Sequence, residues 1–323
     1  YFENGTCKCP NANVGYTATI SGTLYTVVNN SSIAGQIANG NYNLCTTPVT
    51  NMSSLFKDKG SFNSDISFWD TSNVINMSEM FSKATAFNQP IGNWDTSKVT
   101  NMSLMFGGSS FNQDISNWNT AAVTEMMSIF WETPFNQNIG NWNTSNVTQM
   151  GGVFYKSKSF NQDISGWDVS NVLNMEVMFF DAESFNQNIG SWDVSNVSNM
   201  NGMLSNTSIF NQDLSGWCVS KNITDPSNFA VNSALTNANK PIWGTCPSGT
   251  TTSTTGTTTS TTGTTTSTTG TTTSTGGGGG GNTGTTTSTT GTTTSTTSTS
   301  TTGTTTSTTG TTTSTIGTTT SSG

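Results

Sequence analysis

The stretch FNQDISNW, residues 111–118, recurs along the chain with small changes, and each copy starts with a phenylalanine. A tryptophan follows seven positions after that phenylalanine, and successive copies begin 24 or 25 residues apart. The phenylalanines are Phe62, Phe87, Phe111, Phe135, Phe160, Phe185 and Phe210, and the tryptophans are Trp69, Trp94, Trp118, Trp142, Trp167, Trp192 and Trp217. Such a period is typical of solenoids of the leucine-rich-repeat kind, whose units bury their apolar faces only by stacking on neighbours.

The segments between the copies carry a second pattern, which predicts the elements of each coil. From Val74 to Phe81, apolar residues lie at positions i, i+3, i+6 and i+7, a spacing that places them on one face of a short helix. The preceding polar residues 70–73 offer side-chain oxygens suited to cap the start of that helix. The segment from phenylalanine to tryptophan is the expected strand. Each coil would then contain one short strand and one short helix, so the expected fold is an α/β solenoid with a parallel ladder of strands.

The repeat divides the chain into four parts. We expect residues 1–48 to form an N-terminal cap, residues 49–217 a solenoid of about seven repeats, and residues 218–249 a C-terminal cap. Caps are needed because an open solenoid end exposes its core. Residues 250–323 contain almost only Thr, Ser and Gly, so they cannot form a core of their own.

Alternate repeats differ at one place. Some carry Asp followed by Ile-Ser or Leu-Ser, and those between them carry Pro or Asn followed by Ile-Gly. The first kind contains Asp65, Asp114, Asp163 and Asp213, and the second contains Gly92, Gly140 and Gly190. Stacking would then separate like charges by about 10 Å, close to the screening length, instead of by about 5 Å. Duplication of a two-coil gene segment explains the alternation equally well.

The stretch FNQDISGWDVSNVLNMEVMF, residues 160–179, is similar to the repeat of BspA-like surface proteins, which include a mycoplasma lipoprotein repeat of unknown function. The resemblance covers about residues 49–217, where Phe-Asn, Trp-Asp and Asn-Val-x-x-Met elements recur in this order. It implies an extracellular, non-enzymatic solenoid used in surface structure or adhesion, and it transfers no catalytic residues. The Thr-rich tail lies outside it.

The composition excludes several classes of function. The chain has no His, its nine basic residues are all Lys, and its net charge is −8. Without His it lacks the commonest general base and metal ligand, so we expect no enzyme, no cofactor and no metal site. So few cations make no basic patch for phosphates, which argues against nucleic-acid binding. No apolar run approaches the length of about 18 residues that a membrane span requires.

Five cysteines flank the repeats, and they are Cys7, Cys9, Cys45, Cys218 and Cys246. Their positions favour disulfides in the two caps, formed in an oxidising compartment. We expect Cys218 to pair with Cys246, and Cys45 to pair with either Cys7 or Cys9. The fifth thiol would be free or bonded to another chain.

The chain contains eleven Asn-x-Ser/Thr sequons, which are candidates for N-glycosylation. They are Asn4, Asn29, Asn30, Asn51, Asn76, Asn101, Asn143, Asn146, Asn196, Asn206 and Asn222. Chance produces many sequons in such a chain, and some, such as Asn76, occupy a repeat position where a ladder or capping role is the alternative. We expect about half of them to carry a glycan, with Asn4, Asn206 and Asn222 favoured because they lie in caps or loops.

The tail of residues 250–323 is built on the phrase Thr-Thr-Thr-Ser-Thr-Thr-Gly and is interrupted by a glycine run at 276–281. One interpretation is a flexible linker. The density of hydroxyl groups favours the other, a mucin-like segment held extended by O-linked sugars. The O-glycosylation candidates are Thr257, Thr258, Thr259, Ser260, Thr264, Thr265, Thr266, Ser267, Thr304, Thr305, Thr306 and Ser307.

These features predict a secreted protein, since the chain starts at Tyr1 without Met, as a processed protein would. We expect a glycoprotein that is a structural subunit of an extracellular fibril, hair or coat, with a tail that mediates assembly. Its partners would be other copies of itself and other extracellular matrix or surface glycoproteins. The alternative is a cell-surface adhesin, with a ligand-binding solenoid head on a mucin-like stalk. The end at Thr-Ser-Ser-Gly, without an anchor motif, favours assembly.

Overall fold

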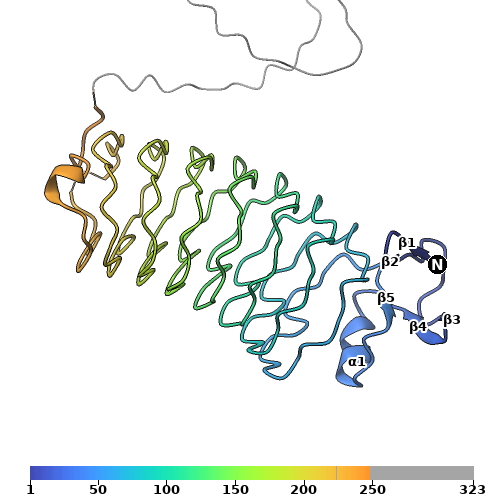
Figure 1. The fold of residues 1–323 in the computed structure, drawn as a ribbon. Coiled ribbons are helices and arrows are strands. Elements are labelled where there is room, and N and C mark those ends of the chain that lie inside the picture. Colours follow the sequence, from blue (N-terminus) through green and yellow to red (C-terminus); the bar gives the residue numbers. More distant parts are fainter. Residues whose placement is uncertain (223, 248–323) are drawn as a thin grey trace, which may run out of the picture. The chain divides into compact units, whose positions relative to one another are not determined.

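The computed structural model describes residues 1–222 and 224–247 (Figure 1), so every expectation for the tail lies outside the described residues. In the N-terminal region, β1 (Phe2–Glu3) pairs antiparallel with β2 (Thr6–Cys7). A second sheet has the order β3 (Thr17–Ile20), β4 (Thr23–Val27) and β5 (Leu44–Cys45), with β3 and β4 antiparallel and β4 and β5 parallel.

Local chemistry explains two elements of this region. Between β3 and β4, Ser21 and Gly22 have φ angles of 50° and 82°, the left-handed values that a two-residue hairpin turn needs to match strand twist. Between β4 and β5 in the chain, α1 (Ile33–Ala38) buries Ile33 and Ile37. This spacing of four residues places both side chains on one face of the helix, where they join the core of the coils that follow.

From residue 49 onward the chain winds into successive coils that lie side by side (Figure 1). Each coil contributes one residue to a parallel ladder of β-bridges, which runs through Asn51, Asn76, Asn101, Glu125, Gln149, Asn174 and Asn199. The predicted strand between phenylalanine and tryptophan is wrong. In that segment the N–H of Asn88 binds the side-chain oxygen of Asn63 at 2.9 Å, so a side chain takes the place of a strand partner.

The helices predicted from Val74 to Phe81 and in its counterparts are also wrong, because α1 and the 3₁₀-helix η1 (Asn237–Asn239) are the only helices among the described residues. Two residues of each coil, four positions apart, have left-handed backbone angles, and Glu79 and Lys83 both have φ of 57°. A left-handed residue interrupts a right-handed helix. The region therefore forms successive turns, and we call it the turn segment, residues 77–83 in this coil.

The polar residues after each tryptophan close turns instead of capping helices. Oδ1 of Asp95 accepts a hydrogen bond from the backbone N–H of Ser97 at 3.0 Å, and Asp168 and Ser170 repeat this contact at 3.0 Å. In such an Asx turn the side-chain oxygen binds a backbone N–H two residues later, so the same oxygen that would have capped a helix closes a turn instead.

The core consists of stacked aromatic columns. Within a coil, the phenylalanine of the turn segment stacks on the phenylalanine of the FNQD stretch, with ring centroids 3.7 Å apart for Phe81 and Phe87. The repeated tryptophans are buried. Trp69 donates its indole N–H to the carbonyl of Tyr42 in the N-terminal region, and the later tryptophans donate to the preceding coil, as Trp142 does to Ile115 at 3.2 Å. Buried aromatic area and a satisfied indole N–H both stabilise the stack.

The alternation between repeats has a steric basis. A Cβ on Gly140 would lie 2.6 Å from the backbone carbonyl oxygen of Asp163 in the next coil, and Gly92 and Gly190 approach their counterparts even more closely. Only glycine leaves room for such an approach. Each glycine-bearing coil therefore leaves space for the backbone of the aspartate-bearing coil that follows it. This steric fit is a third explanation of the alternation, beside charge spacing and gene duplication.

The final described coil continues the pattern in weaker form. Asn228 and Asn232 have φ angles of 57° and 56° and so reproduce the two left-handed positions of the turn segment. Phe229 packs edge-to-face on Trp243 with centroids 4.9 Å apart. In the part of the chain that the structure describes, no helix is long and apolar enough to cross a membrane.

Candidate functional site

Buried threonines form a ladder between coils. Thr71 Oγ1 donates to the carbonyl oxygen of Asp95 at 2.9 Å, and Thr144 makes the equivalent contact with Asp168 at 2.8 Å. These threonines are almost fully buried, and from Val169 onward the position is valine, which has no donor. Because threonine and valine fill similar volumes, the presence of either residue at this position does not reveal the ladder in the sequence.

Surface amides form a second ladder. Oδ1 of Asn112 accepts a hydrogen bond from the backbone N–H of Asn136 at 2.9 Å and another from Nε2 of Gln137 at 3.1 Å. The contact between asparagines recurs in the coils on either side, and the glutamine contact recurs in the following coil, from Gln162 to Asn136. The asparagine and glutamine of FNQD therefore bind neighbouring coils, which gives this phrase a structural role.

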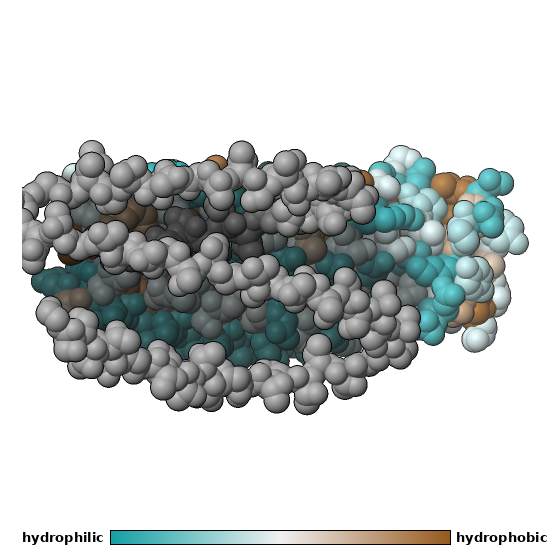
Figure 2. All heavy atoms as spheres, turned by 90° about the horizontal axis from the view of Figure 1, so that it is seen from above, coloured by the Kyte–Doolittle hydropathy of each residue, from teal (hydrophilic) through white to brown (hydrophobic). Residues whose placement is uncertain are grey.

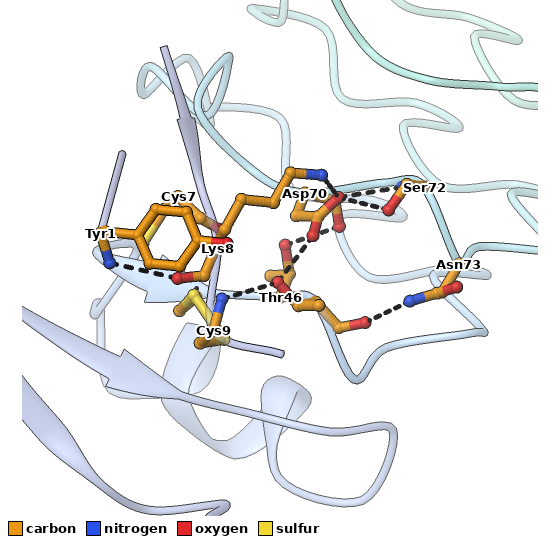
Figure 3. The surroundings of a disulfide bond; sticks show 10 residues. Tyr1, Cys7, Lys8, Cys9, Thr46, Asp70, Ser72 and Asn73 are labelled. Atoms are coloured by element: carbon orange, nitrogen blue, oxygen red, sulfur yellow. Dashed lines mark hydrogen bonds and ion pairs between the residues drawn. A yellow bond between two sulfur atoms is a disulfide. The ribbon is translucent and has the colours of Figure 1, made fainter. Parts of the chain in front are cut away.

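A cluster of charged and polar groups joins the N-terminal region to the first repeat (Figure 3). Lys8 Nζ lies 2.8 Å from Oδ1 of Asp70, whose side chain is 1% exposed. Thr47 Oγ1 donates to Oδ2 of this carboxylate at 2.6 Å, and Ser72 Oγ donates to Oδ1 at 2.7 Å. Burial alone would raise the pKa of Asp70, but these donors outweigh it and hold that pKa below its ordinary value.

Disulfides lie in both end regions of the described chain. The structure joins Cys218 to Cys246, and it joins Cys45 to Cys9 instead of to Cys7. Cys7 keeps a free thiol and is 1% exposed. Burial raises the pKa of this thiol, which keeps it protonated and poorly nucleophilic. A buried thiol is also inaccessible to a second chain, so of the two fates expected for the fifth cysteine the structure has the free one.

A pocket of about 490 Å³ opens beside the Cys9–Cys45 disulfide. Its lining includes Tyr1, Tyr16 and Lys8, and both tyrosines are more than half exposed. At this end of the molecule, on the right of Figure 2, hydrophobic patches lie among hydrophilic residues. Aromatic walls with a single cation suit a small organic ligand or a peptide side chain. The pocket does not bring together the paired acid and base that hydrolysis needs.

The structure places the eleven sequons in different environments. At three of them the side-chain nitrogen, the atom to which a glycan is attached, donates to a backbone carbonyl of the neighbouring coil. The distances are 2.8 Å from Asn146 to Ala121, 2.7 Å from Asn196 to Ser170 and 2.8 Å from Asn222 to Val197. Asn222, which the sequence favoured, is also only 8% exposed and so offers little access to a glycan-transferring enzyme.

Other sequons are open to modification. Asn4, Asn51 and Asn143 are exposed, and their side-chain nitrogens donate no hydrogen bond within residues 1–222 and 224–247. Asn29, Asn76 and Asn206 are half-buried, and their side-chain nitrogens also donate no hydrogen bond within the described residues. By contrast, the side-chain nitrogen of Asn30 donates to Thr50, and that of Asn101 donates to Glu125. The O-glycosylation candidates, from Thr257 to Ser307, lie outside the described residues.

One protein family matches the chain, twice, over residues 24–139 and 129–243, and its description is "Mycoplasma protein of unknown function, DUF285". No curated protein and no solved structure matches. The mycoplasma resemblance expected from the sequence is thereby confirmed at the level of the family. Because the two matches span more than half of the chain, this protein belongs to the DUF285 family of mycoplasma-type surface proteins built of repeats.

Proposed function

We propose that this protein is a secreted glycoprotein and a structural subunit of an extracellular fibril, hair or coat, with a solenoid of stacked coils as its folded part. The observation that carries the proposal is the unbroken series of backbone hydrogen bonds between coils, from Met52 and Asn76 at 2.9 Å to Leu204 and Phe229 at 2.7 Å. Such a series suits a stiff scaffold element. Membership in a surface repeat family supports an extracellular setting.

The proposal extends to partners and modifications. Its partners are other copies of the chain and other extracellular matrix or surface glycoproteins, and the tail of residues 250–323 is O-glycosylated, extended and engaged in assembly. Among the N-glycosylation sequons, the exposed Asn4, Asn51 and Asn143 are the most accessible. No catalytic role or cofactor is included, since the chain has no His to act as a general base.

Electron microscopy of the native secreted material, with its sugars intact, tests this function. Filaments with a regular subunit repeat are expected, and a chain lacking residues 250–323 should no longer form them. Glycopeptide mass spectrometry of the same material should find glycans at Asn51 and Asn143 and bare side chains at Asn146 and Asn222. Dispersed single particles would contradict the structural role.

The pocket beside Cys9 and Cys45 favours a second candidate, an adhesin with a ligand-binding head on a mucin-like stalk. Its exposed Tyr1 and Tyr16 are suited to contact a sugar or a peptide from another surface. Binding to arrayed glycans and peptides measures this directly. If Tyr16→Ala abolishes binding to a ligand found on the array, the adhesin function is supported. If the variant still binds that ligand, the pocket is not the binding site.

A further inference from the structure

The backbone ladder of the turn segments points in one direction. The N–H groups of Ser54, Phe56 and Asp58 donate to carbonyls of the next coil at 3.0, 2.9 and 2.8 Å. The last turn segments repeat this arrangement, with Gly202, Leu204 and Asn206 donating to Ser227, Phe229 and Val231 at 2.8, 2.7 and 2.8 Å. Along the whole stack, therefore, the amides of these segments face the C-terminal side and the carbonyls face the N-terminal side.

The C-terminal edge of the ladder consists of donors. The amides of Asn228, Ala230 and Asn232 occupy the positions that donate in every earlier coil, yet they make no hydrogen bond within the described residues. Pro226 occupies the remaining donor position and has no N–H. The same end exposes Val231 by 48%.

The N-terminal edge consists of acceptors. In the described part of the chain, the carbonyls of Ser53, Leu55 and Lys57 receive no hydrogen bond, although their counterparts in later coils do. Helix α1 packs its apolar face into the adjoining core, but the amide of Gln36 binds the carbonyl of Ser32 next to its own helix and gives nothing to this edge. Leu55 stays half-buried, whereas its counterpart Met80 is fully buried.

We propose that copies of this chain stack head to tail, with the amides of Asn228, Ala230 and Asn232 donating to the carbonyls of Ser53, Leu55 and Lys57 in a second copy. The contact repeats the register that joins neighbouring coils within one chain. An edge with donors alone cannot pair with an identical edge, and neither can an edge with acceptors alone. This polarity excludes a symmetric end-to-end dimer through the ladder and selects a heterologous contact, which propagates into a linear assembly.

The proposal rests on the proposed fibril function and assigns it a contact within the folded coils, separate from any contact of the tail. It also brings two side chains together. Val231 and Lys57 each precede the second left-handed residue of their turn segment, and residues at this position stack on one another within the chain, as Tyr155 and Phe180 do at 5.1 Å. In the head-to-tail contact, Val231 of one copy therefore lies against Lys57 of the next.

A charge-swap series in the full secreted chain tests this contact. Val231→Lys places two cations against each other and should weaken association by about tenfold or more, measured by sedimentation over a concentration series. Within one chain Lys57 pairs with Glu79, so the restoring variant exchanges both of these charges. Adding Lys57→Glu and Glu79→Lys to Val231→Lys should restore assembly, because the pair within the chain is kept and the contact between copies becomes attractive. Leu173→Lys, which adds the same charge at an exposed position in the middle of the stack, should assemble like the wild type.

The outcomes separate this proposal from the fibril function. Thermal melting first verifies that every variant is folded. If the wild type forms filaments and Val231→Lys assembles equally well, or if the triple variant is not restored, head-to-tail stacking is overturned while the fibril function stands. If the wild type forms no assembly at any concentration, both fail.

Discussion

At Gly140 the absence of a side chain lets the next coil approach, because a Cβ there would lie 2.6 Å from the carbonyl oxygen of Asp163. We expect Gly140→Ala to lower the free energy of unfolding by about 2–3 kcal/mol, since a backbone atom cannot rotate away from the clash. Gly166→Ala is the matched control, because its Cβ would meet nothing closer than the carbonyl of Gly140 at 3.7 Å. Urea unfolding followed by tryptophan fluorescence measures both, and equal effects at the two glycines would contradict the steric explanation.

Asp70 is the one buried carboxylate in the described chain, and it couples the N-terminal region to the repeats. Asp70→Asn should cost about 2–3 kcal/mol at neutral pH, because Lys8 loses a charged partner in a largely buried site. Asp95→Asn, at the equivalent exposed position of the next coil, should change stability by less than about 0.5 kcal/mol.

The pH dependence of this effect follows from the direction of the pKa shift. The pKa of Asp70 is lower in the folded protein than its ordinary value of 3.8, so the carboxylate stabilises the fold above that value. The stabilisation is lost as pH falls through the lowered folded pKa. The difference between wild type and Asp70→Asn should therefore shrink in denaturation curves recorded at increasingly acidic pH, and a difference that stays constant would argue against an ionic contribution.

At the scale of the element, the turn segment holds ordinary residues in a left-handed conformation. Val177 has φ of 48°, where a β-branched side chain is strained, and the neighbouring coils place Gly152 and Gly202 at this position. Val177→Asn should raise the free energy of unfolding by about 0.5–1 kcal/mol, because asparagine tolerates this backbone better. Leu173→Asn, at an exposed residue outside the left-handed set, should give no such gain in the same thermal melts.

The turn segment also shows why part of the fold could not be predicted. The spacing of Met and Phe identified the buried side chains, since an inward-facing set looks alike in a helix and in a series of turns. What excludes the helix is the left-handed backbone at residues such as Glu79 and Lys83, and neither residue type indicates it. Glycine, the residue that usually indicates a left-handed backbone in a sequence, stands at these positions in only some coils.

The candidate sites divide in the same way. Exposed sequons could be listed from the sequence, but the hydrogen bond that occupies the nitrogen of Asn222 depends on the neighbouring coil. The choice of Cys9 over Cys7 as the partner of Cys45 also depends on packing, because the two cysteines are only two residues apart in the chain. The pocket beside this disulfide joins residues of the N-terminal sheets that follow no repeat, so no period could reveal it.

At the scale of the whole molecule, coils bind only their neighbours, so stability should be lost from an end. Replacing Cys218 and Cys246 by serine opens a link between residues 28 positions apart and should cost about 3–4 kcal/mol. Hydrogen exchange should then accelerate in the last coils, near Met203 and Phe229, while the coils around Phe106 keep their protection. A uniform loss of protection along the stack would contradict this local unfolding.

The fit between glycine-bearing and aspartate-bearing coils also restricts how such a chain can change length during evolution. Removing a single glycine-bearing coil would seat a serine, such as Ser116, against the carbonyl that Gly140 now accommodates. Gain or loss of two coils at once leaves every such contact as it was. Recombination among genes of this kind should therefore preserve lengths that differ by even numbers of coils, and the pair, not the single repeat, is the unit that descendants inherit.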